Sequence, residues 1–303
     1  MRRLASSPKA GVAVRPRSAA PFPSRHRELL VASALMQLTP VSRRTPLSLD
    51  DRAAGRPAEL PDDDELKKTT NDLLKRLGEL QATLYADGRY AVLVVLQARD
   101  AGGKDGTVRK VFGACNPLGC QVASFKVPTP LELSHDYLWR VHQAVPPKGM
   151  LGIFNRSHYE DVLVVRVKEF VPKAVWSKRY DQINEFERML DDNRVKIIKF
   201  FLHISRDEQA DRMRDRLSDP RKNWKFRAGD LDDRDLWDEY TKAYRDALRL
   251  CSTPWAPWYV VPADDNKARN YYVARTMVDT LDGLGLRYPK ADRQALKLKR
   301  KLK

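Results

Sequence analysis

The sequence predicts an α/β protein in which helices cover both faces of a central parallel sheet of five strands, giving three layers. The first observation is a series of apolar runs separated by segments of helical character, an alternation typical of parallel sheets. The runs cover residues 91–96, 121–125, 150–154, 195–204 and 258–261. The second is that the first run is apolar on both faces, as a buried central strand requires. The third is a glycine-rich turn directly after that run, at the strand end where ligands of such folds bind.

An amphipathic helix is expected before the first strand. Gly88 stands where a helical C-cap is expected, and leucines recur on one stripe from Asp62 onward. These leucines are Leu66, Leu73, Leu74, Leu77, Leu80 and Leu84. The stripe predicts a helix that leads into the core.

The basic character of the chain is concentrated at its two ends. Of a net charge of +16, residues 1–60 contribute eleven Lys/Arg against four Asp/Glu, and the basic tail at 290–303 contributes seven against one. The domain expected at 61–289 is therefore nearly balanced, and its charge does not indicate specific nucleic-acid binding. We expect residues 1–60 to be disordered or an over-extended reading frame, with Met36 as a candidate start. An Arg-rich, acid-poor beginning is also compatible with a transit peptide.

Membrane and metal-thiolate classes are not supported by the composition. The longest apolar run, Ala91–Leu96, is far short of the roughly 20 residues of a membrane-spanning helix. The chain has three cysteines, and Cys115 and Cys120 lack a second Cys or His pair at zinc-site spacing. We expect free thiols in a reducing cytosol, and hence a cytoplasmic protein.

The turn after the first strand, QARDAGGKDGT at 97–107, has the context of a phosphate-binding loop. Lys104 would supply a point charge, while backbone N–H groups face an anion at three glycines: Gly102, Gly103 and Gly106. The sequence departs from G-x-x-x-x-G-K-[ST] at Ala98 and Asp105. Asp100 offers a carboxylate for Mg²⁺ or for the acceptor. The expected fold is therefore P-loop NTPase-like.

A second polar turn, NRSHYED at 155–161, follows the third apolar run. Ser157 and Glu160 have the spacing of a helix capping box. That role leaves Arg156 unexplained, because a cation at a helix N-terminus opposes the macrodipole. We therefore expect an anionic ligand near Arg156. Arg166, further along the same helix, has a solvated alternative.

An arginine-rich segment at about 205–227 is expected to form a lid. It begins with a capping box, SRDE, carries Arg212 and Arg216 on one helical face, and stops at Asp219–Pro220 before the basic loop RKNWKF. Cations on a closing segment stabilise the charge that spreads over a transferred phosphoryl group. The alternative is that the arginines pair with neighbouring aspartates on a solvated helix.

Five motifs between residues 62 and 286 resemble, in order and spacing, the second family of polyphosphate kinases, the polyphosphate:nucleotide phosphotransferases. They are QARDAGGKDGT, SFKVPT, LSHDYLWRVH, FNRSHYEDVLVVRV and RMRDRLSDPRKNWKF. The resemblance implies a thymidylate-kinase-like core with a helical lid and Mg²⁺ as cofactor, with Mn²⁺ as an alternative ion. It also implies direct in-line transfer from polyphosphate to AMP or ADP, giving ADP and ATP, by a homo-oligomer, either a dimer or a tetramer.

The resemblance also implies roles for individual residues. Its catalytic positions fall on Asp100, Lys104, Arg156 and Arg216. The positions expected to bind polyphosphate or nucleotide are Gly102, Gly103, Asp105, Gly106, Thr107, Lys126, Asp136, Arg140, Asn155, Arg166, Arg212, Lys222, Lys225, Lys267 and Arg269. A polyanion with about one charge per phosphate needs such a row of cations. The expected metal ligands are Asp100, Glu160 and Asp161.

Asn155 departs from the family pattern, since many members carry Asp where this chain has an amide. An amide is a poorer Mg²⁺ ligand than a carboxylate, so Glu160 or Asp161 is expected to take over part of that role. The FNRS form followed by Tyr-Glu-Asp resembles the branch, class III, that is associated with the use of both AMP and ADP.

Three alternatives stay open from the sequence. An ATP-dependent nucleoside monophosphate kinase would use the same loop and lid, although the distributed cations favour a polymeric donor. A nucleic-acid-binding protein would act through the basic tails, with steeply salt-dependent affinity. A phosphohistidine intermediate would need a histidine in the site, but in-line transfer needs none. His203 lies within a predicted strand, and we expect it to be a satisfied core residue.

Overall fold

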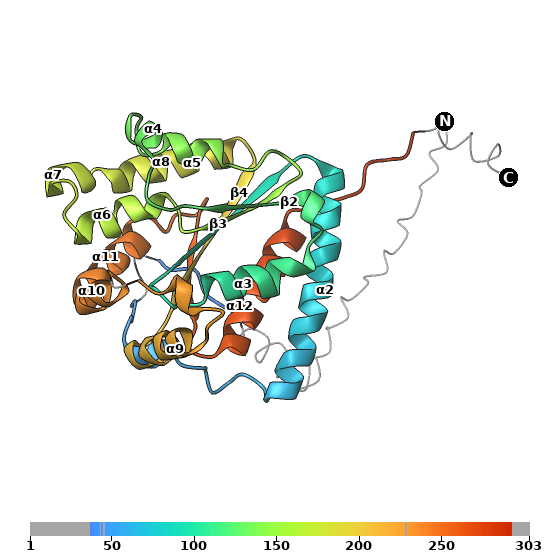
Figure 1. Cartoon of the computed structure of the whole chain (residues 1–303). Helices are drawn as coiled ribbons and strands as arrows, with labels where there is room; N and C mark the ends of the chain where they lie inside the picture. The colour runs from blue at the N-terminus through green and yellow to red at the C-terminus, as the bar shows by residue number, and fades with distance from the viewer. Residues whose placement is uncertain (1–36, 43, 45, 228, 293–303) are drawn as a thin grey trace, which may run out of the picture. The chain divides into compact units, whose positions relative to one another are not determined.

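The computed structural model describes residues 37–42, 44, 46–227 and 229–292. Its five strands form one sheet, as predicted (Figure 1). They are β1 (Ala91–Ala98), β2 (Cys120–Ser124), β3 (Leu151–Asn155), β4 (Val195–His203) and β5 (Trp258–Pro262). The order is β2-β3-β1-β4-β5 and every neighbouring pair is parallel. All eight residues of β1 are buried, because β1 lies between β3 and β4 and is covered on both faces.

Helices cover both faces of the sheet (Figure 1). One layer holds α2 (Asp63–Asp87), α3 (Lys104–Val111) and α12 (Asn266–Gly283), and the opposite layer holds α8 (Arg179–Asp192) and α11 (Trp237–Leu250). The other α-helices are α4 (Pro130–Leu133), α5 (Trp139–Gln143), α6 (Val164–Val167), α7 (Lys173–Trp176), α9 (Arg206–Ser218) and α10 (Gly229–Asp235). The 3-10 helices are η1 (Asp51–Ala54), η2 (Phe112–Ala114), η3 (Pro117–Gly119), η4 (His158–Asp161) and η5 (Asn223–Lys225).

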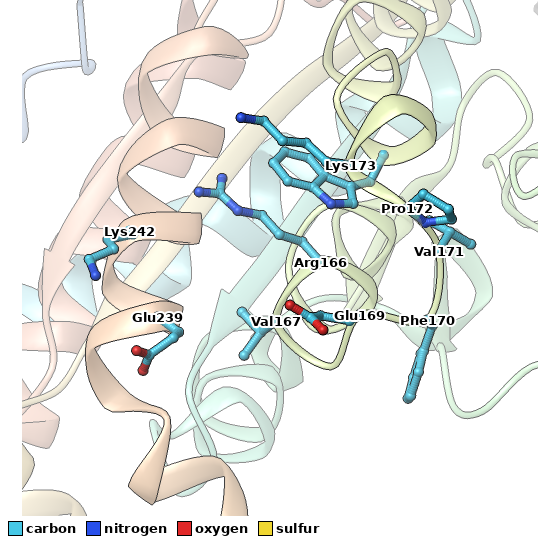
Figure 2. A pocket seen from close by; sticks show the side chains of 10 residues that line it. Arg166, Val167, Glu169, Phe170, Val171, Pro172, Lys173, Glu239 and Lys242 are labelled. Carbon is cyan, nitrogen blue, oxygen red and sulfur yellow. The ribbon is translucent and has the colours of Figure 1, made fainter.

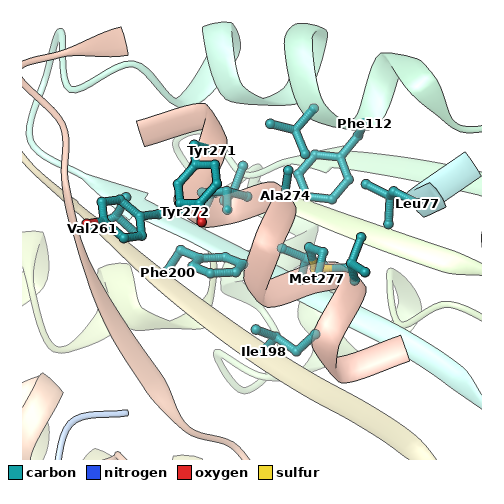
Figure 3. Packing of buried hydrophobic residues seen from close by; sticks show 14 of the residues in the cluster. Leu77, Phe112, Ile198, Phe200, Val261, Tyr271, Tyr272, Ala274 and Met277 are labelled. Carbon is teal, nitrogen blue, oxygen red and sulfur yellow. The ribbon is translucent and has the colours of Figure 1, made fainter. Parts of the chain in front are cut away.

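Five of the six leucines of the predicted stripe of α2 are buried, and the sixth, Leu73, is partly buried against the same cluster. Asp62 caps the helix by accepting hydrogen bonds from the N–H groups of Asp64 and Glu65, and Gly88 ends it in the left-handed conformation, with φ of 64°. Figure 3 shows Leu77 of α2 and Met277 of α12 in one apolar cluster with Phe200 of β4. This packing fixes α12, and with it Arg269, against the glycine-rich turn.

The folded unit begins earlier than the boundary expected at residue 61. Leu49, Ala54 and Leu60 are buried. The Nε2 atom of His203 lies 2.8 Å from the carbonyl oxygen of Asp50. The segment at 46–60 is mostly irregular apart from the short helix η1, so its sequence has no helical or strand periodicity from which its packing could be predicted. His203 is confirmed as a buried strand residue with a backbone partner; the expectations for residues 1–36 and 293–303 lie outside the described residues.

Two further features of the described part of the chain concern its cysteines and its helices. Cys115 and Cys120 are free thiols, and Cys115 is buried. Within the described residues, the longest helices are too polar to cross a membrane.

Candidate active site

The turn after β1 has the backbone of a phosphate loop. Gly103 precedes α3 with φ of 94°, and Ala101 is also left-handed, with φ of 59°. A Cβ atom on Gly103 would collide with the guanidinium of Arg269, and one on Gly102 would lie 2.6 Å from the Cβ of Ala98. The N–H groups of the first turn of α3 have no partner within the helix. The glycines therefore allow close approach of backbone and cation around a space suited to an anion.

Lys104, the first residue of α3, lies inside this loop. Its Nζ donates hydrogen bonds to the carbonyl oxygens of Ala98, at 2.9 Å, and Arg99, at 3.3 Å. Burial, together with the nearby charge of Arg156, lowers the pKa of Lys104 to about 8. A phosphate in the loop would oppose both effects, so binding of an anion should raise the pKa of Lys104 and hold the side chain in its charged form.

Arg156 connects two carboxylates at the ends of β1 and β3. Its guanidinium donates to Asp100 at 2.8 Å and to Glu160 at 3.1 Å, and its backbone is left-handed, with φ of 63°. The charge of Glu160 raises the pKa of Arg156 above its ordinary value, against the opposing effect of burial and with help from Asp100. A left-handed non-glycine residue costs about 1–2 kcal/mol, and such strain is concentrated at functional sites.

Two of the three expected metal ligands, Asp100 and Glu160, are brought together by this arginine. Asp161 lies elsewhere: it accepts a hydrogen bond from Arg179 at 2.9 Å, and burial raises its pKa to about 6. No group of three or more His, Cys, Asp or Glu suited to a metal occurs in the described residues. A hard divalent ion that uses one or two carboxylates plus substrate phosphates needs no such group. Asp100 and Glu160 therefore fit an ion of this kind, whereas Asp161 is paired with Arg179.

The expected helix after β3 differs from the prediction. Ser157 caps it by accepting from the N–H of Tyr159, but the helix is the single 3-10 turn η4, and the side chain of Glu160 contacts Arg156 instead of completing a capping box. The box after β4 is likewise half formed. Ser205 accepts from the N–H of Glu208, while the Glu208 side chain accepts from Arg212 at 2.8 Å. In both places a nearby arginine competes successfully for the glutamate.

A helix, α9, occurs in the segment expected to form a lid, and its arginines have different partners. Arg212 reaches the phosphate loop, donating to the carbonyl oxygens of Ala101 at 3.2 Å and Asp264 at 2.7 Å. Arg216 lies 3.5 Å from Asp230 on α10. Only Arg214, of the arginines on this helix, forms the solvated pair that the alternative reading predicted, with Asp211.

A polar bridge joins the lid to the loop. Asp105 accepts from Asn155 at the end of β3 and from Lys225 in η5, both at 2.9 Å. Burial alone would raise the pKa of Asp105, but these hydrogen bonds outweigh it and hold the pKa below its ordinary value. Asp105, Asn155 and Lys225, which were all expected to bind substrate, therefore meet at position 105, where the P-loop pattern has Ser or Thr.

Arg269 of α12 completes the cationic group. Its side chain is almost fully buried and has only amide partners among the described residues: Asn266 and Asn270. Burial and the charge of Arg212 lower the pKa of Arg269 to about 10. A buried guanidinium without a carboxylate partner is costly, and an anionic ligand would remove that cost.

Other expected binding residues lie outside this group. Arg166 donates to Asp246 at 2.7 Å and to Tyr180 at 2.9 Å, beside a separate cavity of about 610 Å³ between α6, α7 and α11 (Figure 2). Lys267 forms an ion pair with Asp63 of α2. Lys222 pairs with Asp219 at 3.0 Å.

The residues expected on the segment after β2, and Thr107, are engaged with backbone. Arg140 donates to the carbonyl oxygen of Lys126 at 2.9 Å, and Asp136 accepts from the N–H of Leu138. The Thr107 hydroxyl donates to the carbonyl oxygen of Gly103 at 3.1 Å.

Three residues of the site were missed from the sequence. Gln209 of α9 donates to the carbonyl oxygen of Asp100 at 3.0 Å, and Asp230 is the partner of Arg216. Arg99 is buried with its guanidinium 3.7 Å from the ring of Trp237, and burial lowers its pKa to about 10. Arg99 could have been found from the sequence, because it is a charged residue within the glycine-rich motif. Gln209 and Asp230 could not, because the residues that they contact lie in other segments of the chain.

Comparison with known proteins agrees with this geometry. The family model described as polyphosphate kinase 2 matches residues 60–287. The chain belongs to the polyphosphate kinase 2 family. The AMP/ADP-polyphosphate phosphotransferase of Meiothermus ruber is 61% identical over 226 residues, which cover 75% of this chain and 85% of that protein. The ADP-polyphosphate phosphotransferase of Rhodopseudomonas palustris is 46% identical over 241 residues, covering 74% and 83%.

A solved structure supports the same assignment. Polyphosphate kinase 2 from Arthrobacter aurescens TC1 superposes with a TM-score of 0.80 at 39% identity, covering 88% of this chain and 96% of that one. The fold is therefore that of the family.

Proposed function

We propose that this polyphosphate kinase 2 family member transfers a phosphoryl group from inorganic polyphosphate to AMP and to ADP. The observation that carries the proposal is the convergence of Lys104, Arg212 and Arg269 on the glycine-rich turn. Among the described residues Lys104 and Arg269 form no ion pair with a carboxylate, while Arg212 pairs with Glu208 of its own helix. A site of this charge suits a polyanionic substrate. We infer AMP and ADP as the acceptors because the two relatives above are named as an AMP/ADP-polyphosphate phosphotransferase and an ADP-polyphosphate phosphotransferase.

The protein's own groups would act by position and charge. Backbone N–H groups of the loop and Lys104 would bind the phosphates, and Arg156 would hold Asp100 and Glu160 at the edge of the site. Arg212 from the lid side would stabilise negative charge on the transferred group. Asp100, at the end of β1, is the carboxylate placed to orient the acceptor. We propose no phosphorylated histidine, because in-line transfer needs none and His158, in the turn after β3, is buried and bonded to Glu187.

We propose Mg²⁺ as the divalent ion, with Mn²⁺ as an alternative, held by Asp100 and Glu160. Bound there, such an ion would neutralise charge on the phosphate oxygens. Asn155 donates its amide to Asp105, which leaves Glu160 as the better placed replacement for the carboxylate usual at position 155.

We also propose a cytoplasmic homo-oligomer, a dimer or a tetramer. Large apolar side chains are exposed around the edge strand β2 and α4, namely Leu118, Val122, Val127, Leu131 and Leu133. Such exposure on one edge of a sheet is typical of an interface between subunits. Light scattering on the purified protein measures the mass directly, and a monomer at micromolar concentration would refute this part.

The test of the function is product formation by the purified protein with a divalent ion and long-chain polyphosphate, offering AMP and ADP in separate reactions. We expect ADP from AMP and ATP from ADP, resolved by chromatography. Transfer to ADP alone would leave the family assignment intact but remove AMP as an acceptor. Transfer from ATP but not from polyphosphate would favour an ordinary nucleoside monophosphate kinase.

A further inference from the structure

A fully buried charged network lies directly behind the turn that presents Arg156. The ammonium of Lys199, on β4, donates to the Tyr159 hydroxyl at 2.7 Å, to the Cys251 carbonyl oxygen at 2.7 Å and to the Glu187 carboxylate. All three of its N–H donors therefore have partners. The side chains of Lys199 and Glu187 are 0% and 1% exposed.

The same carboxylate holds the two residues that follow the Arg156 turn. Glu187, on α8, accepts from the Tyr159 hydroxyl at 3.0 Å and from Nε2 of His158 at 3.2 Å. The Nδ1 atom of His158 has no hydrogen-bond partner among the described residues, which is consistent with a neutral ring that donates from Nε2. Burial lowers the pKa of His158, in the same direction.

The turn is also attached to β1 on its other side. The N–H of Arg156 donates to the carbonyl oxygen of Leu96 at 3.1 Å, and Gln97 donates to the Ser157 hydroxyl at 3.1 Å. A left-handed arginine persists only where its surroundings enforce that backbone. Here β1 holds the start of the turn, and Glu187 with Lys199 holds the part that follows.

We propose that Glu187 and Lys199 are positioning residues for the reaction, which fix the left-handed turn at Arg156 so that its guanidinium spans Asp100 and Glu160. A buried ion pair is weak evidence for stability, because apolar groups of similar size often stabilise a core as well. A positioning role instead explains why the pair bonds to His158 and Tyr159. The inference rests on the proposed function for its kinetic test, but not for its structural one.

The kinetic test compares Glu187→Gln/Lys199→Met with Leu190→Ala. The double variant removes both buried charges together, so neither is left unpaired. Leu190 is a buried residue one turn further along α8, and its truncation lowers stability without touching the network. We expect the double variant to lose about 10- to 100-fold in kcat, with KM for polyphosphate within about threefold of wild type. Leu190→Ala should keep its kcat at temperatures below its own unfolding.

Two further readouts separate positioning from a general structural effect. If the network acts through Arg156, adding Arg156→Ala to the double variant should lower kcat no further than Arg156→Ala alone. Hydrogen exchange of the peptide covering residues 154–162 should be faster in the double variant than in Leu190→Ala at equal stability. The exchange measurement needs no substrate, so it decides the inference even if wild-type protein proves inactive with polyphosphate, which would refute the proposed function. Unchanged kcat and unchanged exchange in the double variant would overturn the inference.

Discussion

The affinity of the site for a polyphosphate should fall as the pH rises through about 8, because of Lys104. Burial and Arg156 lower the pKa of this lysine from 10.5 to about 8 in the ligand-free protein. A phosphate beside it favours the charged form, so binding should return the pKa toward its ordinary value. The two values differ by about 2.5 pK units, or about 3 kcal/mol between the protonated and neutral forms.

The direction of this pH dependence follows because the protonated, charged form of Lys104 is the one that binds phosphate. Below about pH 8 Lys104 is already charged, and the affinity should be independent of its titration. Above pH 8 each binding event must first take up a proton, so the affinity should fall about tenfold between pH 7 and pH 9. Arg99 and Arg269, with pKa values of about 10, remain charged over this range.

Isothermal titration calorimetry with tripolyphosphate at pH 7 and pH 9, in two buffers of different ionisation enthalpy, measures both the affinity and the proton uptake. Lys104→Met is the control, since the ligand's own groups titrate equally with both proteins. We expect the excess proton uptake and the extra pH dependence in wild type only. Equal pH dependence in the two proteins would refute the assignment of Lys104 to the phosphates.

Three other substitutions test separate parts of the site. Gly103→Ala should lower the free energy of unfolding by about 1–3 kcal/mol and remove most of the activity, because Gly103 has a left-handed backbone and lies against Arg269. The control Gly113→Ala, which has open space around it, should change neither quantity appreciably. Urea unfolding and initial rates measure both variants, and a fully active Gly103→Ala would contradict the loop geometry. Arg216→Ala should lower kcat, though by less than Lys104→Ala does, whereas Arg214→Ala, on the exposed face of the same helix, should leave kcat and KM unchanged. If the two arginine variants had the same kinetics, Arg216 would be a solvated surface residue with no part in the reaction. Glu160→Gln should raise the divalent-ion concentration needed for half-maximal rate, and Asp161→Asn should not, because Asp161 pairs with Arg179. If Asp161→Asn raised that concentration and Glu160→Gln did not, Asp161 would be the metal ligand instead of Glu160.

The sheet and the main helices could be predicted because their signals are local. The apolar run of β1 and the leucine stripe of α2 each follow from the burial of a continuous segment, and Gly88 ends α2 through its own backbone freedom. The glycine-rich turn could be recognised for the same reason, since Gly103 and Lys104 stand next to each other in one motif; its role in binding phosphate stays a prediction.

Two other kinds of contact could not be read in this way. The glutamates at 160 and 208 have capping-box spacing, but each bonds instead to an arginine four residues away, and the sequence pattern does not decide between the two local partners. The network of Lys199 and Glu187 gave no signal at all, because a lysine within an apolar strand and a glutamate within an amphipathic helix are ordinary residues until the fold pairs them. The resemblance placed Arg166 and Lys267 among the binding residues, and the structure gives both of them other partners.

The most direct test of direct transfer at the glycine-rich turn is a single-turnover experiment with ³²P-labelled polyphosphate and excess protein. With AMP present, wild-type protein should place the label on ADP, and with no nucleotide the protein itself should remain unlabelled. Lys104→Ala should form labelled ADP slower by about 100-fold or more. Stable label on the protein, or equal rates of ADP labelling by wild type and Lys104→Ala, would contradict in-line transfer at this loop.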